Sequence, residues 1–243
     1  MPFSHYSEKA RWALDFLGLD YTEDAWMPML HLLATLPVGG RSVPVLVDGG
    51  KVIPDSTEIL LHLDSKAPAG RRLFPEDPAE RAAALDIEEF CDRRVGTASR
   101  SWVYSEMLVD PWGMGKRLGR GRPPLQKALL PLAMTLARRG ISRAYKVKPG
   151  HPEEWEGKLR AAFDEVGQRL AASTGRYLVG DRFTAADLTF AALAAPALFP
   201  PGHPGMTASP DELPARPRAV IEDLRETPAG RHALFLYREH RGR

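Results

Sequence analysis

The chain has 243 residues, of which 44% are hydrophobic and 26% charged, and its formal net charge is +2. A chain of this length can bury a sizeable core in one or two domains, and so small a net charge does not by itself indicate a polyanionic partner. The single cysteine, Cys91, excludes an intrachain disulfide and a zinc site built from cysteines. No apolar run approaches the roughly 20 residues of a membrane span, so we expect a cytoplasmic enzyme or binding protein.

The first expected element is a helix over residues 7–18, which follows a polar run at residues 4–7. Its apolar positions recur at the i, i+3, i+4, i+7 spacing of one helix face, and Gly18 is a stop signal. Ser4 stands just before this helix, where a serine hydroxyl can accept a hydrogen bond from a backbone N–H of the first turn.

A strand–turn–strand pattern follows. Residues 21–26 could form a short strand, and residues 43–47, which begin Val43-Pro44, are β-branched and apolar, as expected for a buried strand. Asp48-Gly49-Gly50 predicts a hairpin turn, with residues 51–53 as the returning strand. Residues 56–66 form the second expected helix, with Ser56 as its N-cap.

Residues 67–78 are rich in proline and mark a domain boundary. We predict a small α/β domain over residues 1–68, a linker over 69–78 and an all-α domain over 79–243. The expected helices of the second domain cover residues 79–108, 153–173, 184–195, 218–226 and 228–239. The third of these opens with Thr184-x-x-Asp187, a variant of the capping box.

Ten lysines and arginines and no acidic residue lie between Pro111 and Pro152. In this basic segment, residues 116–148, four leucines form an apolar stripe between the charges: Leu125, Leu129, Leu132 and Leu136. A solvated basic face is one interpretation. The alternatives are a funnel for anionic substrates and a helix that lies on a membrane surface.

The polar helix start, the Val-Pro step, the Asp55-Ser56 helix start and Thr184-x-x-Asp187 together resemble the glutathione S-transferase family, in particular its cytosolic, bacterial, serine-type-like members. The resemblance covers most of the chain and is poor over residues 109–152. It implies an α/β plus all-α fold: a thioredoxin-like domain that binds glutathione, followed by an all-helical C-terminal domain.

The Ser-x-x-Ser-x-Arg-x-Arg motif of the serine-type members implies that Ser4 is the catalytic residue, with Ser7 as the alternative and Lys9 and Arg11 in the basic positions. The N-terminus of a helix favours a thiolate over a thiol, and a neighbouring hydroxyl can stabilise that thiolate further. The competing interpretation is that Ser4 only caps the helix. His5 is expected to be an exposed loop residue.

The resemblance also implies the residues that bind glutathione. A cis peptide bond before Pro44 would turn the backbone of Val43 toward the cysteinyl part of the peptide, which would pair with it as an added strand does. Asp55 and Ser56 would hold the γ-glutamyl end at the N-terminus of the second helix. The family usually has Glu at the position of Asp55, and plain helix capping remains the alternative.

In the family, a first strand inside the sheet precedes this motif, whereas only Met1-Pro2-Phe3 precede Ser4 here. Loss of an interior strand would leave two strands unpaired. We therefore expect the natural start to lie upstream; the alternative is a truncated relative that has lost glutathione binding.

The leading hypothesis is a transferase that conjugates glutathione, its co-substrate, to an electrophilic apolar or anionic small molecule held between the domains. The second hypothesis is a non-catalytic binding or interaction module with the same fold. The family implies a homodimer. We expect no nucleic-acid partner, because the basic residues are not interleaved with aromatic ones, no membrane association, and no metal, because the histidines are scattered.

Overall fold

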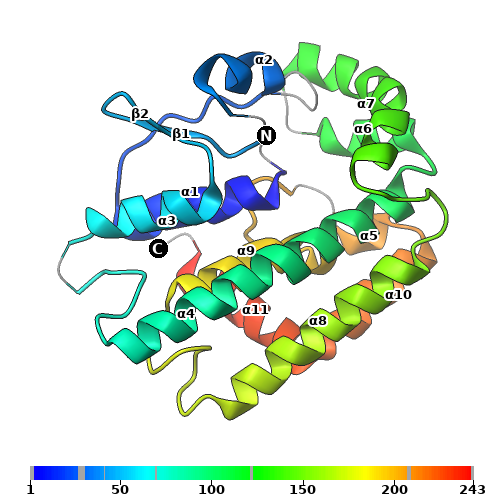
Figure 1. Cartoon of the computed structure of the whole chain (residues 1–243). Helices are drawn as coiled ribbons and strands as arrows, with labels where there is room; N and C mark the ends of the chain where they lie inside the picture. The colour runs from blue at the N-terminus through cyan, green and yellow to red at the C-terminus, as the bar shows by residue number, and fades with distance from the viewer. Residues whose placement is uncertain are drawn as a thin grey trace.

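The computed structural model describes residues 3–26, 31–40, 42–68, 70–120, 123–206 and 209–241. Figure 1 shows a small α/β part, in blue and cyan, against a larger helical part. The small part contains α1 (His5–Leu17), α2 (His31–Thr35), η1 (Leu36–Val38), β1 (Leu46–Asp48), β2 (Lys51–Ile53) and α3 (Ser56–Ser65). The predicted class, α/β plus all-α, is confirmed.

Among the described residues the sheet is a two-stranded antiparallel hairpin, with Leu46 opposite Ile53. Gly49 and Gly50 form its turn at positive φ, a conformation that glycine adopts without a steric penalty. The strand predicted over residues 43–47 begins only at Leu46, because Pro44 has no N–H to give to a ladder. Residues 21–26, expected as a strand, have no strand beside them and form none.

The helical part begins with α4 (Pro78–Phe90), the π-helical segment η2 (Cys91–Gly96) and α5 (Thr97–Met107), which follow one another without a break where one helix was predicted. The remaining elements are α6 (Pro111–Leu118), α7 (Pro124–Ala144), α8 (Glu153–Ala172), α9 (Ala185–Leu198), η3 (Pro210–Glu212), α10 (Ala215–Glu226) and α11 (Pro228–His240). Every residue of α9 is buried, so this helix is the centre of the core.

The capping box predicted at the start of α9 is present. The backbone N–H and the hydroxyl of Thr184 each lie 3.1 Å from Oδ2 of Asp187. Oδ1 of the same carboxylate accepts the N–H of Leu178 at 3.0 Å and lies 3.0 Å from Nε2 of His232. A fully buried carboxylate is tolerated only with such partners, so Asp187 holds the start of α9, the loop before it and α11 together.

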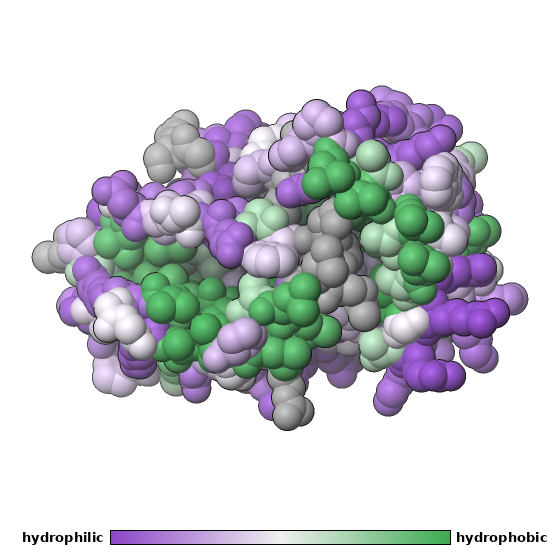
Figure 2. Space-filling model, turned by 90° about the horizontal axis from the view of Figure 1, so that it is seen from above, coloured by the Kyte–Doolittle hydropathy of each residue, from purple (hydrophilic) through white to green (hydrophobic). Residues whose placement is uncertain are grey.

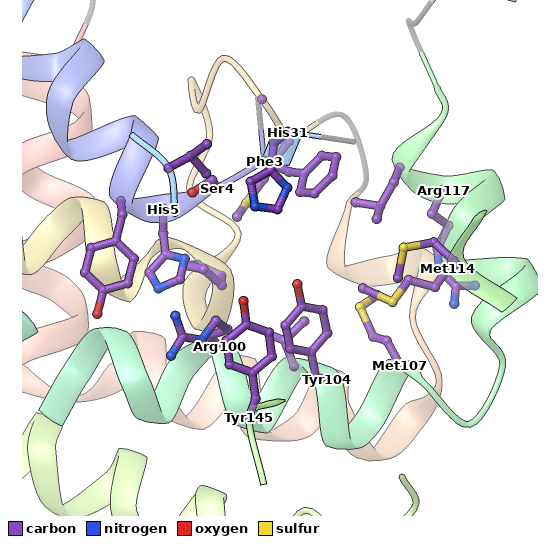
Figure 3. A pocket seen from close by; sticks show the side chains of 18 of the residues that line it. Phe3, Ser4, His5, His31, Arg100, Tyr104, Met107, Met114, Arg117 and Tyr145 are labelled. Atoms are coloured by element: carbon purple, nitrogen blue, oxygen red, sulfur yellow. The ribbon is translucent and has the colours of Figure 1, made fainter. Parts of the chain in front are cut away.

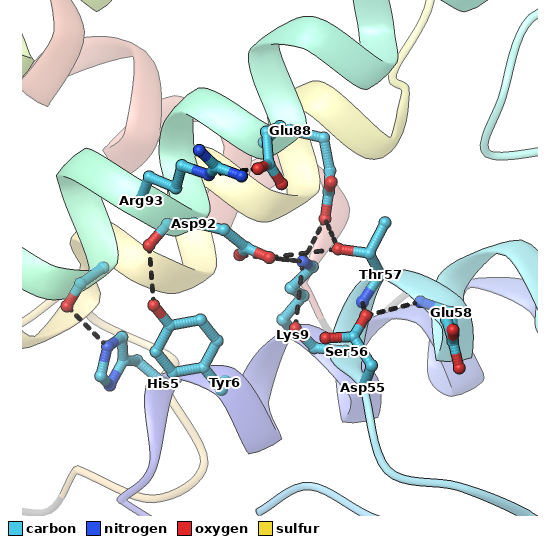
Figure 4. Close-up of polar contacts among 12 residues, drawn as sticks. His5, Tyr6, Lys9, Asp55, Ser56, Thr57, Glu58, Glu88, Asp92 and Arg93 are labelled. Atoms are coloured by element: carbon cyan, nitrogen blue, oxygen red, sulfur yellow. Dashed lines mark hydrogen bonds and ion pairs between the residues drawn. The ribbon is translucent and has the colours of Figure 1, made fainter.

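Lys9 of α1 is fully buried, and its ammonium joins the small part to the helical part (Figure 4). Nζ donates to the two carboxylate oxygens of Asp92 at 2.9 and 3.0 Å, to Glu88, and to Oγ of Ser56 at 3.3 Å. The hydroxyl of Thr57 lies 2.9 Å from Glu88. Burial raises the pKa of Glu88 and of Asp92, and the charge of Lys9 opposes that rise.

Backbone carbonyl oxygens of the π-helical segment η2 lie at hydrogen-bond distance from two aromatic side chains of α1. The hydroxyl of Tyr6 donates to the carbonyl of Asp92 at 2.8 Å, and Nε2 of His5 lies 3.0 Å from that of Gly96. A Cβ at position 96 would lie 2.6 Å from the hydroxyl oxygen of Tyr6, so the close approach requires glycine. Segments of π-helix are rare and occur often at functional sites, and this one holds α1 in place beside the cavity described below.

His5 is therefore a correction to the sequence-based expectation, because it is a buried helix residue and not an exposed loop residue. Burial, and after it the positive charge of Arg100, lowers its pKa to about 3. At neutral pH the imidazole is uncharged and is a weak base.

Helices α6 and α7 pack mainly against each other, and their apolar side chains form a second, smaller core together with Leu108 and Val147. A Cβ on Gly115 would collide with the backbone of Pro131, so this glycine lets the two helices approach. This α6–α7 hairpin carries most of the basic segment; Arg122 lies outside the described residues. The four leucines of the stripe are 40–75% exposed, and Figure 2 shows apolar patches among polar side chains on the face seen from above.

Within the described ranges, no helix combines the length and the apolar character that crossing a bilayer requires.

Replacing Lys9 with Met should destabilise the protein by about 3–5 kcal/mol, because Glu88 and Asp92 would lose their buried cation. Urea unfolding at pH 7 measures this change. The control Lys158→Met removes the exposed pair with Glu154 on α8 and should cost less than about 1 kcal/mol. The triple variant K9M/E88Q/D92N should recover part of the loss; an unchanged unfolding midpoint in K9M would show that the cluster does not stabilise the fold.

His5→Gln should flatten the dependence of the unfolding free energy on acid pH. The folded-state pKa of His5 is lowered from 6.5 to about 3, so its contribution is complete above pH 6.5 and is lost as the pH falls toward 3. In that window the unfolded chain binds a proton that the folded chain does not. The unfolding free energy therefore changes with pH with a slope of up to about 1.4 kcal/mol per pH unit. Urea titrations between pH 4 and 7 measure it.

His203 is also buried, with its pKa lowered to about 4, so part of the slope should remain in His5→Gln. The exposed His151 provides a matched histidine-to-glutamine control, His151→Gln, measured in the same titrations. Equal slopes for all three proteins would contradict the assignment to His5.

Candidate functional site

A cavity of about 200 Å³ lies between the small part and the helical part (Figure 3). The small part contributes the residues at the start of α1, together with His31 and Val43. Helix α5 contributes Arg100 and Tyr104, and the α6–α7 hairpin closes one side with a largely apolar wall. Both parts of the fold are therefore needed to form the cavity.

Ser4 lines this cavity and is the N-cap of α1. Its Oγ accepts the backbone N–H of Ser7 at 3.3 Å. A serine hydroxyl has one donor and two lone pairs, so this hydrogen bond leaves its proton free. Capping the helix and donating a hydrogen bond into the cavity are thus compatible roles for Ser4.

The peptide bond between Val43 and Pro44 is cis, as the family resemblance implied. Val43 lines the same cavity as Ser4, although 38 positions separate them, whereas Pro44 is half-buried outside the lining. The structure therefore brings Val43 and Ser4 to one cavity.

Asp55 and Ser56 differ from the expected arrangement. Asp55, and not Ser56, is the N-cap of α3: its Oδ1 accepts the N–H groups of Thr57 and Glu58 at 2.9 and 3.0 Å. Ser56 is the first helical residue, buried, with its hydroxyl accepting from Lys9. Aspartate and serine are about equally good N-cap residues, so the residue types alone did not decide between these two neighbouring positions.

The other residues of the serine-type motif point away from the cavity lining. Ser7 is buried one turn into α1, and its backbone N–H is used by Ser4. Lys9 belongs to the buried cluster with Glu88, and Arg11 pairs with Glu8 at 3.0 Å. Of the described residues that line the cavity, none is Ser7, Asp55 or Ser56. The two basic positions of the motif therefore stabilise the fold.

Several lining residues were not identified from the sequence. Tyr104 of α5 and Tyr145, just after α7, stack with ring centroids 5.3 Å apart, and Figure 3 shows both hydroxyls pointing into the cavity. Burial raises the pKa of Tyr104. Arg100 and Arg117 complete the polar part of the wall. The signal in the sequence was the cluster of basic residues around Arg117, because a contact between residues as far apart as Tyr104 and Tyr145 leaves no periodic pattern.

The described part of the chain contains no group of three or more His, Cys, Asp or Glu side chains placed to hold a metal ion. Cys91 is buried in η2, and burial raises the pKa of its thiol well above the usual value. It therefore behaves as a packing residue and not as a nucleophile.

Comparison with known protein families gives two matches. The profile described as "Glutathione S-transferase, N-terminal domain" matches residues 1–72, and "Glutathione S-transferase, C-terminal domain" matches residues 141–222. The unmatched stretch between them includes α4, η2, α5, α6 and most of α7. The matches cover more than half of the chain and include Ser4, Val43, Asp55 and Ser56.

Curated relatives include glutathione S-transferase U3 of Arabidopsis thaliana, which is 32% identical over 111 residues, 44% of this chain and 49% of the relative. Glutathione transferase GST 23 of Zea mays is 34% identical over 93 residues, 37% of this chain and 41% of the relative. The chain thus matches less than half the length of these relatives.

Solved structures resemble this one over nearly its whole length. The β-etherase LigF from Sphingobium sp. strain SYK-6 has a TM-score of 0.55 at 21% identity, covering 95% of this chain and 94% of that chain. Glutathione transferase F7 from Populus trichocarpa has a TM-score of 0.55 at 19% identity, covering 96% and 94%. At these identities the likeness concerns the fold alone. The two matched domains, in this order on this fold, show that the chain belongs to the glutathione S-transferase family.

Proposed function

We propose that this protein is an enzyme that conjugates glutathione to an electrophilic small molecule bound in the cavity between its two parts. The observation that carries the proposal is that Ser4 and Val43 line one cavity, with a cis bond between Val43 and Pro44. The proposal includes a homodimer in the cytoplasm, which is typical of the family.

In the proposed reaction the hydroxyl of Ser4 donates a hydrogen bond to the thiolate of glutathione and lowers the pKa of its thiol. The N-terminus of α1 adds a partial positive charge at the same place. The thiolate sulfur then attacks the electrophilic carbon, a C–S bond forms, and the leaving group departs with its electron pair. The thiol proton goes to solvent, because His5 is uncharged, buried and a weak base.

Glutathione itself would lie along the small part. The backbone of Val43 would pair with the cysteinyl residue, and Asp55 and Ser56 would hold the γ-glutamyl end. The remaining space is lined by aromatic and methionine side chains and by two arginines, so it would receive an apolar or anionic acceptor.

The second candidate function is a non-catalytic binding module. It is favoured by the state of α3: the carboxylate of Asp55 already accepts two N–H groups of its own helix, and Ser56 is turned toward Lys9. Glutathione would have to compete for these groups.

Ser4→Ala should lower kcat for conjugation on the order of 10²-fold, because one hydrogen bond to the developing charge is lost. The affinity for glutathione should change little, and the pH at which bound glutathione ionises, followed by the ultraviolet absorbance of its thiolate, should rise. Ser7→Ala is the matched control and should resemble the parent. Loss of turnover in Ser7→Ala with activity retained in Ser4→Ala would transfer the role to Ser7.

Millimolar glutathione should raise the thermal midpoint of the parent, because a ligand that binds only the folded state stabilises it. The rise should shrink in Ser56→Ala and in Asp55→Asn. Asparagine caps a helix as well as aspartate does, so Asp55→Asn removes the charge proposed to hold the amine without removing the cap. Differential scanning calorimetry provides the midpoints.

The absence of any shift in the parent would favour the non-catalytic module. A full shift in Asp55→Asn would show that Asp55 acts only as a cap.

A further inference from the structure

Two arginines in the cavity wall form no ion pair with any aspartate or glutamate of the described ranges. Arg100 of α5 and Arg117 of α6 both line the cavity, and no aspartate or glutamate is among the described lining residues. The Nε atoms of both side chains are buried without a hydrogen-bond partner in the part of the chain that the structure describes. A partly buried guanidinium without an acidic partner is costly, and an anion in the cavity would compensate its positive charge.

The guanidinium of Arg100 is held by aromatic rings. Its central carbon lies 4.2 Å from the ring centroid of Tyr145 and 5.8 Å from that of Tyr6. Figure 3 shows this side chain on the cavity floor, below His5 and beside Tyr145. Contact with a ring face fixes the plane of a guanidinium. Because Nε is buried, a carboxylate in the cavity would bind to the two terminal nitrogens, whose paired N–H groups match its two oxygens.

The positive charge of Arg100 and Arg117 meets no carboxylate among the described residues that line the cavity. After burial, the charge of Arg100 is the next cause of the lowered pKa of His5. Glu212 feels the charge of Arg117 more weakly than that of Arg120, with which it forms an ion pair. Glu212 is outside the lining, and its ion pair is formed with Arg120.

Most of the remaining wall is apolar and adaptable. Met107, Met114, Met134 and Met206 line it, and methionine accommodates aromatic ligands of varied shape. An acceptor that fills this space would thus have an apolar body and place a negative charge at the arginines.

We propose that the acceptor substrate is an aromatic or similarly apolar electrophile with a carboxylate, and that Arg100 binds the carboxylate, with Arg117 as a second cation in the wall. This inference deepens the proposed transferase function and rests on it for turnover, but the binding of the carboxylate does not require glutathione. Binding and conjugation can therefore be tested separately.

The binding test uses 3,5-dinitrobenzoate and the uncharged 3,5-dinitrobenzamide, neither of which has a leaving group, in isothermal titration calorimetry with the full chain. The parent should bind the carboxylate at least about tenfold more tightly than the amide, an effect of one charge-assisted pair. Arg100→Met should abolish this preference and Arg117→Met should reduce it. Arg138→Met, at an exposed position of the basic segment outside the lining, should leave it unchanged.

Amide binding is the internal control for folding, because it should persist in Arg100→Met if the cavity is intact. Equal affinities for carboxylate and amide in the parent would overturn the proposal without any variant. A preference that survives both Arg100→Met and Arg117→Met would also overturn it. If saturating S-methylglutathione displaces the carboxylate, Arg100 serves a carboxylate of glutathione and the assignment to the acceptor is wrong.

The turnover arm uses 4-chloro-3,5-dinitrobenzoate against its amide. The thiolate sulfur forms a bond to the chlorine-bearing carbon and chloride leaves with the electron pair. The carboxylate should have the higher kcat/KM, and Arg100→Met should remove the advantage mainly through KM. If the carboxylate binds but neither compound is turned over, the transferase function is contradicted and the anion site is supported. If both compounds are turned over without a preference, the anion site is contradicted and the transferase function is supported.

Discussion

The ammonium of Lys9 is the interaction on which the rest of the structure depends. It is fully buried at the point where α1, α3, α4 and η2 meet, and its partners come from both parts of the chain. A buried charge is stable only if its partners are correctly placed. The contacts of Lys9 therefore fix both how far α1 lies from the helical part and where on the helical part it packs. The start of α1, with Ser4, is held at the cavity as a consequence.

The π-helical turn at η2 is the second part of the same constraint. The carbonyl oxygen of Asp92 accepts a hydrogen bond from the hydroxyl of Tyr6, and that of Gly96 lies at hydrogen-bond distance from Nε2 of His5. Both side chains belong to α1 and lie about one turn before Lys9. Asp92 thus binds α1 twice, through its carboxylate and through its carbonyl. The continuous helix from α4 to α5 also carries Arg100 and Tyr104 one to two turns further on, so the interface that orders α1 also orders the opposite wall of the cavity.

The α6–α7 hairpin forms one wall of the cavity. Its apolar side chains belong to the second, smaller core, and it lies in the stretch that the two family profiles leave unmatched, apart from the end of α7. Met114, Arg117 and Met134 reach the cavity from it. The wall proposed to receive the acceptor is therefore built partly from residues outside the two matched ranges, whereas the proposed glutathione side is built from the matched N-terminal domain.

Local patterns in the sequence were enough to predict the fold class, the hairpin at Gly49-Gly50, most helices, the cis bond before Pro44 and the capping box of Thr184 and Asp187. Each of these depends on residues close together in the chain or on a resemblance carried by short motifs. The domain limits at residues 69–78 and the roles of Ser4, Val43, Asp55 and Ser56 stay predictions.

Tertiary structure alone decided which polar residues face the cavity and which are used inside the fold. Lys9 and Arg11 occupy motif positions but pair with carboxylates of the fold, Asp55 replaced Ser56 as the cap, and His5 is buried. The arginines of the cavity wall come from helices whose contacts are made across long sequence distances. A single sequence shows how polar and apolar residues are spaced within one helix or strand. The free energy of burying a charged side chain depends on partners from other elements, which only the folded chain brings together.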